Sequence, residues 1–145
     1  FVPDRVADIG SGSGVLAMAA ASVWPSSVIA SDIDPVAVDV ARSNLVANGL
    51  EHRVEAVVAT GFDHPDLAGP FDLILANILK GPLIELAGDM ARALNPGGHA
   101  ILSGILVDQA ETVAAHYQAA GFNLVERQDI VDWTTLSLSR NHLNF

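Results

Sequence analysis

Residues 8–14, Asp-Ile-Gly-Ser-Gly-Ser-Gly, have the spacing most indicative of chemistry in this chain. Glycine at alternate positions removes Cβ atoms, so the backbone can turn sharply and lie against a ligand. An Ala-rich helical pattern follows at Val15–Val23, and the free N–H groups at its start would face the same ligand. A short apolar strand running into such a turn is typical of a nucleotide-type cofactor site on an α/β sheet.

Polar residues close the expected strands that neighbour this turn. Asp8 ends the first strand, Asp32 ends the second at residues 28–32, and Asn77 ends a fourth at Phe71–Asn77. The carboxylate of Asp32 can accept both hydroxyls of a ribose. The amide of Asn77 has both a donor and an acceptor, so it can hold a neutral amine near an electrophile. These spacings predict one site at the carboxyl edge of a sheet.

The glycine motif alone does not identify the cofactor. Residues 12–17 match the G-x-G-x-x-A spacing of NAD-binding turns, and Asp32 or Asp34 stands at the expected acidic position. Asp8 suits a ligand with a cationic amino-acid end and would repel a pyrophosphate, which favours S-adenosylmethionine. A NAD-linked oxidoreductase is kept as an alternative, although no catalytic His–Asp or Tyr–Lys arrangement is evident. A glycine turn with a purely structural role is a third possibility.

Strand patterns alternate with helical patterns along the whole chain, which predicts a doubly wound α/β fold. The expected strands are residues 6–9, 28–32, 54–59, 71–77, 99–103, 122–129 and 133–139. The last two are joined by too few residues for a helical crossover, so they should form an antiparallel hairpin. We therefore expect a seven-stranded, mostly parallel sheet with a C-terminal antiparallel hairpin and helices on both faces.

Local signals place the helices between these strands. Asp34 is predicted to cap a helix that begins at Pro35 and has its buried face at Ala37, Val40, Ala41 and Leu45. Another helix is predicted to begin at Pro82 and to end in a turn at residues 95–98. Asp108 is expected to cap the helix that follows the fifth strand.

Composition limits the possible partners and cofactors. The 145 residues suit a single domain over residues 1–145, and 50% of them are apolar. The net charge of −10 argues against nucleic-acid binding, which needs clustered cations. There are no cysteines and the histidines are scattered, so no metal site is expected. We expect no membrane span and no secretory leader, and hence a cytoplasmic protein.

The chain resembles the S-adenosylmethionine-dependent methyltransferases with a Rossmann-like fold. More narrowly, it is similar to the PrmA family, which methylates a large-subunit ribosomal protein. The matching segments are residues 8–17, 31–38, 75–86, 94–98 and 102–106. The glycine block and the Pro-Gly-Gly of residues 96–98 are general to the superfamily, whereas the Asn-Ile-Leu and Leu-Ser-Gly-Ile-Leu runs are more specific to this family.

The resemblance implies methyl transfer from S-adenosylmethionine to lysine or α-amino groups of a protein, namely a large-subunit ribosomal protein. A methyltransferase for another protein or a small molecule, or a non-catalytic scaffold, is an alternative. The resemblance implies that Gly10, Asp32 and Asn77 contact the cofactor and that Asp8, Ser11 and Gly12 line the same turn, and we expect Ile33 to bind the cofactor as well. We expect Asn77 to be the catalytic residue, which orients the amine or the donor. The family usually has cysteine at position 11, and its N-terminal substrate-recognition domain is expected to be absent from this sequence.

Overall fold

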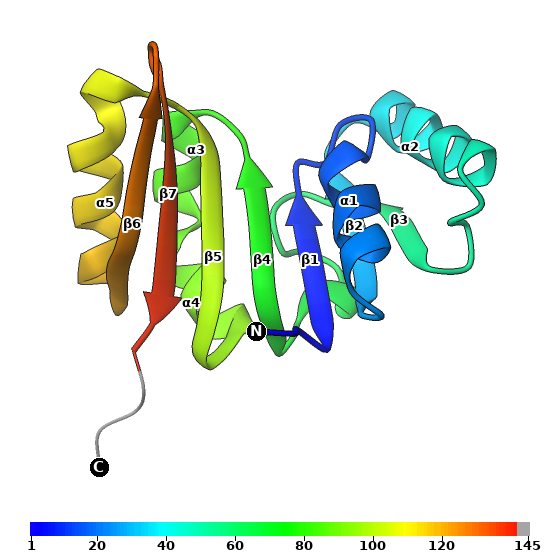
Figure 1. Cartoon of the computed structure of the whole chain (residues 1–145), viewed down its shortest axis with the longest axis horizontal. Helices are drawn as coiled ribbons and strands as arrows, with labels where there is room; N and C mark the ends of the chain where they lie inside the picture. Colours follow the sequence, from blue (N-terminus) through cyan, green and yellow to red (C-terminus); the bar gives the residue numbers. More distant parts are fainter. Residues whose placement is uncertain (142–145) are drawn as a thin grey trace.

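A twisted sheet of seven strands organises the computed structural model, which describes residues 1–141 (Figure 1). Its order is β3-β2-β1-β4-β5-β7-β6. The strands are β1 (Arg5–Ile9), β2 (Ser27–Asp32), β3 (Val54–Val58), β4 (Phe71–Asn77), β5 (Leu94–Leu106), β6 (Phe122–Ile130) and β7 (Trp133–Arg140). The α-helices are α1 (Val15–Val23), α2 (Pro35–Ala47), α3 (Lys80–Glu85), α4 (Ala87–Ala93) and α5 (Ala110–Ala119).

The strand directions confirm the predicted mixture of parallel and antiparallel pairs. The first five strands pair in parallel, and β7 is antiparallel to both β5 and β6. The chain runs outward from β1 through β2 to β3, then returns to β4 on the other side of β1. The carboxyl ends of β1 and β4 therefore lie side by side where the direction of winding reverses. Sheets of this kind bind their ligands in the crevice at this point.

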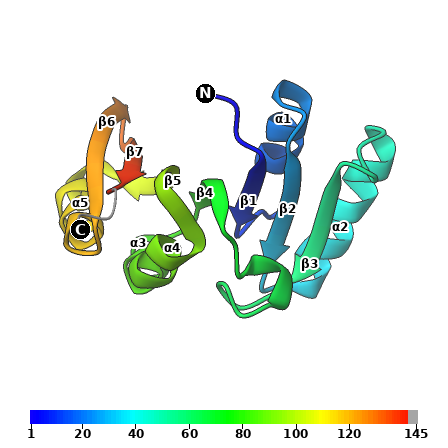
Figure 2. The same cartoon turned by 90° about the horizontal axis from the view of Figure 1, so that it is seen from below.

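Helices cover both faces of the sheet, as predicted (Figure 2). One buried cluster joins α1 and α2 to β1–β3 and to Leu73 of β4, and the other joins α3, α4 and α5 to residues of all seven strands. Tyr117 of α5 is fully buried in the second cluster, and its hydroxyl donates a hydrogen bond of 2.7 Å to the carbonyl of Leu83. Tyr117 is therefore a core residue, in agreement with its helical spacing.

The start of α2 is as predicted, and its buried face is as predicted at Ala41 and Leu45 but not at Val40. The side chain of Asp34 accepts a hydrogen bond of 2.9 Å from the N–H of Val36, which caps the helix. Val40, predicted to be buried, is 46% exposed, and Val38 is buried in its place. The buried stripe of α2 is Val38, Ala41 and Leu45, whose spacing of three and four residues places them on one face of a helix.

The segment predicted as one helix from Pro82 forms two short helices. The first, α3, begins at Lys80, so Pro82 lies in its first turn, where a missing N–H is tolerated. The predicted turn at residues 95–98 lies within β5, whose register with β4 shifts between Phe71 and Leu73. The extra residues form a bulge in the strand, which is why β5 begins at Leu94.

The cap predicted at Asp108 is also wrong. A short 3₁₀ turn, Val107–Gln109, precedes α5. The side chain of Gln109 accepts a hydrogen bond of 3.1 Å from the N–H of Leu106. The capping interaction therefore belongs to the 3₁₀ turn, and α5 itself has no side-chain cap at its start.

Candidate active site

The glycine turn after β1 approaches the segment after β4 closely. Gly10 has φ +70°, and a Cβ at this position would overlap Cγ2 of Ile78. The N–H of Ser11 donates a hydrogen bond of 2.8 Å to the carbonyl of Ser31, which fixes the turn to the end of β2. A glycine at position 10 is therefore required both by the backbone conformation and by the packing.

Asp32 connects the end of β2 to the glycine turn. Its Oδ2 accepts a hydrogen bond of 2.9 Å from the N–H of Gly12, and its Oδ1 accepts one of 3.0 Å from the N–H of Asp34. A carboxylate has about four acceptor positions, so both oxygens can accept further hydrogen bonds. The half-buried Asp32 thus orders the turn and still presents its carboxylate to a ligand.

Asp8 lies beneath the turn and is buried. Its Oδ2 accepts a hydrogen bond of 3.1 Å from the N–H of Ala17, in the first turn of α1. Its Oδ1 is buried without a hydrogen-bond partner within residues 1–141. Burial, with a smaller contribution from the negative charge of Asp32, raises the pKa of Asp8 to about 7, although the bond from Ala17 opposes the shift. Asp8 therefore orders the start of α1 and leaves an unused acceptor below the turn.

A cleft of about 710 Å³ opens beside this turn, between the ends of β1, β2 and β3 and the start of α3. Three of the predicted residues line it: Gly10, Asp32 and Ile33. Asp63, Glu85 and Asp89 also line it, whereas none of the described lining residues is Lys or Arg. Asp89 pairs with Arg92, whereas Asp32, Asp63 and Glu85 form no ion pair with a Lys or Arg of residues 1–141. The three unpaired carboxylates favour a positively charged ligand and disfavour a pyrophosphate.

Asn77 lies in a second pocket, of about 500 Å³, which it shares with Ser103, Gly104, Trp133 and Thr134. Ile78 and Leu79 line both the cleft and this pocket, so they form the wall between the two. The structure thus brings the predicted residues to one edge of the sheet but divides them. Gly10, Asp32 and Ile33 face the cleft, Asn77 faces the neighbouring pocket, and the backbone of Ser11 and Gly12 supports the turn.

The prediction from sequence missed the acidic residues Asp63, Glu85 and Asp89 and the pocket residue Trp133. A signal for Asp63 was available, because it follows a strand whose carboxyl end must reach the same edge as Asp32. No comparable signal pointed to Trp133. Its place beside Asn77 depends on β7 inserting next to β5, which brings together segments far apart in the chain.

Metal clusters and membrane-spanning helices are both absent from residues 1–141. No group of three or more His, Asp or Glu side chains in this part of the chain is arranged to hold a metal ion. No helix within the same residues has the length and apolar character needed to cross a membrane.

Comparison with known proteins identifies the family. The family model "Ribosomal protein L11 methyltransferase (PrmA)" matches residues 2–141. The ribosomal protein L11 methyltransferase of Bradyrhizobium diazoefficiens is 49% identical over 140 residues, which are 95% of this chain and 48% of that protein. The protein of the same name from Chelativorans sp. is also 49% identical, with the same coverage. This chain thus spans about half the length of these curated relatives.

Solved structures agree with this assignment. The crystal structure of ribosomal protein L11 methylase from Lactobacillus delbrueckii subsp. bulgaricus superposes with a TM-score of 0.89 at 33% identity, covering 98% of this chain and 72% of that one. An RNA methyltransferase from Salinibacter ruber, in complex with S-adenosyl-L-homocysteine, shares the fold with a TM-score of 0.77 at 18% identity, covering 97% and 83% of the two chains. The chain belongs to the ribosomal protein L11 methyltransferase (PrmA) family.

Proposed function

We propose that this chain binds S-adenosylmethionine in the cleft beside the glycine turn and takes part in transferring its methyl group to an amino group of a protein. The observation that carries this proposal is the acidic lining of the cleft, in which Asp32, Asp63 and Glu85 have no Lys or Arg partner among the described residues and only Asp89 is paired, with Arg92. S-Adenosylmethionine has a sulfonium and an ammonium group, and both cations are favoured there. A pyrophosphate, which NAD would bring, is disfavoured.

The chain offers a complementary group for each part of this cofactor. The backbone of Gly10 lines the cleft, and the free acceptor positions of Asp32 suit the ribose hydroxyls. Ile33, at the cleft and 66% exposed, offers an apolar surface for the adenine. Asp8 is buried beneath the turn and lines neither pocket, so its carboxyl group favours the ammonium group through its charge and not through contact. Ser11 and Gly12 contribute the backbone that holds the turn.

The bound donor would supply an activated methyl group: a neutral amine would attack the methyl carbon in line as the C–S bond breaks, with S-adenosylhomocysteine as the leaving group. Because the donor is already activated, the protein needs to supply mainly alignment, which can contribute up to about 7–11 kcal/mol. Asn77 is suited to this role, since it lies just beyond the wall of Ile78 and Leu79. Its amide oxygen can accept an N–H of the amine, which directs the nitrogen lone pair toward the cleft. The proton released from the amine can pass to solvent.

The relatives are named as methyltransferases or methylases of ribosomal protein L11. The family therefore suggests this protein as the methyl acceptor. A net charge of −10 on this chain is compatible with a basic protein substrate. We propose lysine or α-amino groups of that ribosomal protein as the acceptors, methylated in the cytoplasm.

Two measurements test the proposal. Calorimetry should show binding of S-adenosylhomocysteine to the chain, and NADH should not bind. Transfer of tritiated methyl groups from S-adenosylmethionine should label ribosomal protein L11 in preference to other ribosomal proteins and to free lysine. Binding of NADH alone would overturn the choice of cofactor. Labelling of free lysine in preference to L11 would instead favour a small-molecule methyltransferase.

A further inference from the structure

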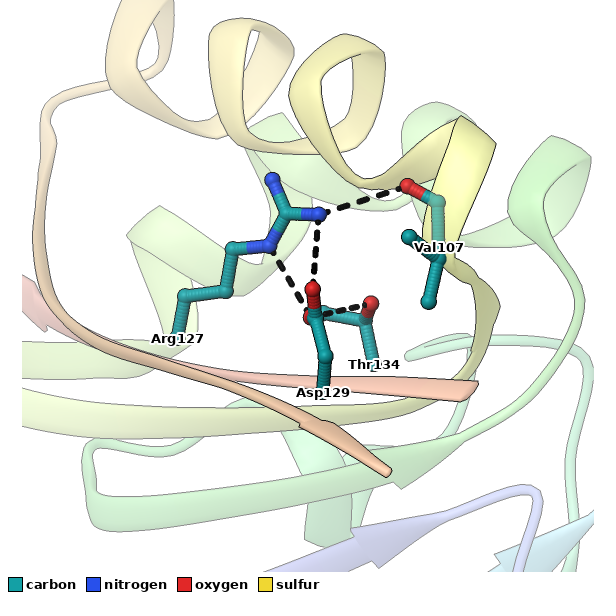
Figure 3. A network of polar contacts seen from close by, with 4 residues as sticks. All are labelled: Val107, Arg127, Asp129 and Thr134. Carbon is teal, nitrogen blue, oxygen red and sulfur yellow. Dashed lines mark hydrogen bonds and ion pairs between the residues drawn. The ribbon is translucent and has the colours of Figure 1, made fainter. Parts of the chain in front are cut away.

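A compact polar network surrounds Asp129 near the tip of the β6–β7 hairpin (Figure 3). The Arg127 guanidinium donates two hydrogen bonds to the carboxylate, of 3.0 Å from Nε to Oδ1 and 3.1 Å from Nη2 to Oδ2. The hydroxyl of Thr134, from β7, donates a third, of 2.7 Å, to Oδ1. The carboxylate of Asp129 therefore links the two strands of the hairpin through side chains.

The same network attaches the hairpin to the end of β5. Nη2 of Arg127 lies 3.4 Å from the carbonyl oxygen of Val107, to which it donates. The N–H of Val107 donates a hydrogen bond of 2.9 Å to the carbonyl of Asp132, in the hairpin turn. Val107 thus contacts the hairpin through both its donor and its acceptor, and the position of the turn is fixed relative to β5.

The residues fixed in this way border the pocket of Asn77. Trp133 and Thr134 both line it, Trp133 being 53% exposed and Thr134 buried. The adjoining Val131 is 88% exposed and has φ +56°, a conformation rare for a β-branched residue. Such a conformation persists only where the surrounding structure imposes it. The tight turn between the paired residues Ile130 and Trp133, together with the bond from Val107 to Asp132, supplies that constraint.

We infer that Asp129 is a positioning residue, which acts through Arg127 and Thr134 to hold Trp133 as the outer wall of the Asn77 pocket and so sets the fit of the acceptor side chain. The inference rests on the proposed function, because that function makes this pocket the acceptor side of the site. Hydrogen bonds from Arg127 and Thr134 hold the pKa of Asp129 below its usual range, so its negative charge persists at neutral pH.

A purely stabilising role does not account for the network. Asp129 is exposed, and ion pairs in water contribute little to stability because solvent screens them. The network instead concentrates three side chains and three backbone groups around one turn, next to a pocket. Removing it should therefore alter the mobility of Trp133 more than the stability of the fold.

Trp133 can report on the network directly. The chain has two tryptophans, so a Trp24→Phe background leaves Trp133 as the sole indole fluorophore. In this background Asp129→Ala and Thr134→Val should each raise the acrylamide quenching constant of Trp133 about twofold, because the indole loses its restraint. Thr134→Ser, which keeps the hydroxyl, should leave the quenching constant at its value in the Trp24→Phe background. Asp39→Ala is the matched control, since Asp39 forms an exposed ion pair with Arg42 on α2, away from the pocket.

Kinetics and calorimetry separate this inference from the proposed function. Asp129→Ala should raise KM for the protein acceptor about five- to tenfold, with the affinity for S-adenosylhomocysteine unchanged, because only the acceptor side is disturbed. Unchanged quenching and unchanged KM in Asp129→Ala, with cofactor binding intact, would overturn the positioning role. Failure of the unsubstituted chain to bind S-adenosylhomocysteine would overturn the proposed function instead, and the quenching of Trp133 would still decide whether Asp129 holds it.

Discussion

Gly104 of β5 passes so close to Asn77 of β4 that a Cβ on the glycine would lie 2.7 Å from Asn77 Oδ1. The same Cβ would lie 3.0 Å from the carbonyl oxygen of Ile78. Gly104 has φ +79° and lies where the pairing of β5 with β7 shifts between Leu102 and Ile105. The bulge in β5 thus brings bare backbone against the candidate catalytic amide, and the position of that amide depends on a glycine.

Gly104→Ala should displace the side chain of Asn77 and strain the backbone. We expect a loss of about 1–3 kcal/mol in the free energy of unfolding and a large fall in kcat. Denaturant unfolding and the transfer of tritiated methyl groups would measure the two effects. Gly49→Ala is the matched control, because Gly49 also has a positive φ, of +67°, but a Cβ there would meet no described atom within 4 Å. Equal loss of activity in both variants would contradict the contact with Asn77.

Much of the fold could be predicted because its signals are local. The alternation of strand and helix patterns, the glycine turn and the cap at Asp34 each depend on residues close together in the chain. The errors arose where distant partners decide the outcome. The sheet extends β5 back to Leu94 through pairing with Phe71, and the packing against β2 and β3 selects Val38 over Val40.

In the candidate site, too, the features set by nearby residues could be predicted and those set by distant residues could not. Asp32 and Gly10 could be predicted because their distance from the first strand is a motif in itself. The separation of Asn77 from the cleft could not, because it depends on Ile78 and Leu79 standing between two cavities. The contribution of Trp133 requires both the hairpin and its insertion beside β5.

Asn77→Ala should impair transfer without impairing cofactor binding. Because Asn77 lies in the neighbouring pocket, the variant should lose alignment of the amine, and kcat should fall about 100-fold. The dissociation constant of S-adenosylhomocysteine, measured by calorimetry, should change less than about threefold. Asn123→Ala, at an exposed position of β6, is the control. A parallel loss of cofactor affinity in Asn77→Ala would contradict this role and make Asn77 a donor-binding residue.

Asp32→Ala should weaken cofactor binding severely. The substitution removes an acceptor for two ribose hydroxyls and releases the N–H of Gly12 from its bond. Hydrogen bonds to a charged group contribute about 1.5–3 kcal/mol each, so the dissociation constant of S-adenosylhomocysteine should rise at least about 100-fold. Asp34→Ala is the control, since it removes a neighbouring carboxylate that caps α2 through Val36. Calorimetry that finds the same affinity in Asp32→Ala as in the parent chain would refute the placement of the ribose.

Asp8→Asn should change how stability depends on pH. The pKa of Asp8 is raised from 3.8 to about 7 in the folded protein, so the folded state binds this proton more tightly than the unfolded state. The stabilisation from the protonated form is complete below the unfolded pKa and is lost as pH rises through about 7. A shift of about three units corresponds to at most about 4 kcal/mol. The neutral amide that Asp8→Asn introduces keeps an acceptor for the N–H of Ala17 and carries no charge to bury.

The stability of the parent chain relative to Asp8→Asn should therefore decline between about pH 4 and pH 7 and level off above it. Urea unfolding of both proteins across this range measures the difference, in which the titration of all other groups cancels to first order. Asp34→Asn, at an exposed position at the start of α2, is the matched control for replacing a carboxylate with an amide. A constant difference between the parent chain and Asp8→Asn from pH 4 to pH 8 would mean that Asp8 is ionised in the fold throughout. Its buried Oδ1 would then have to find a partner that compensates its charge.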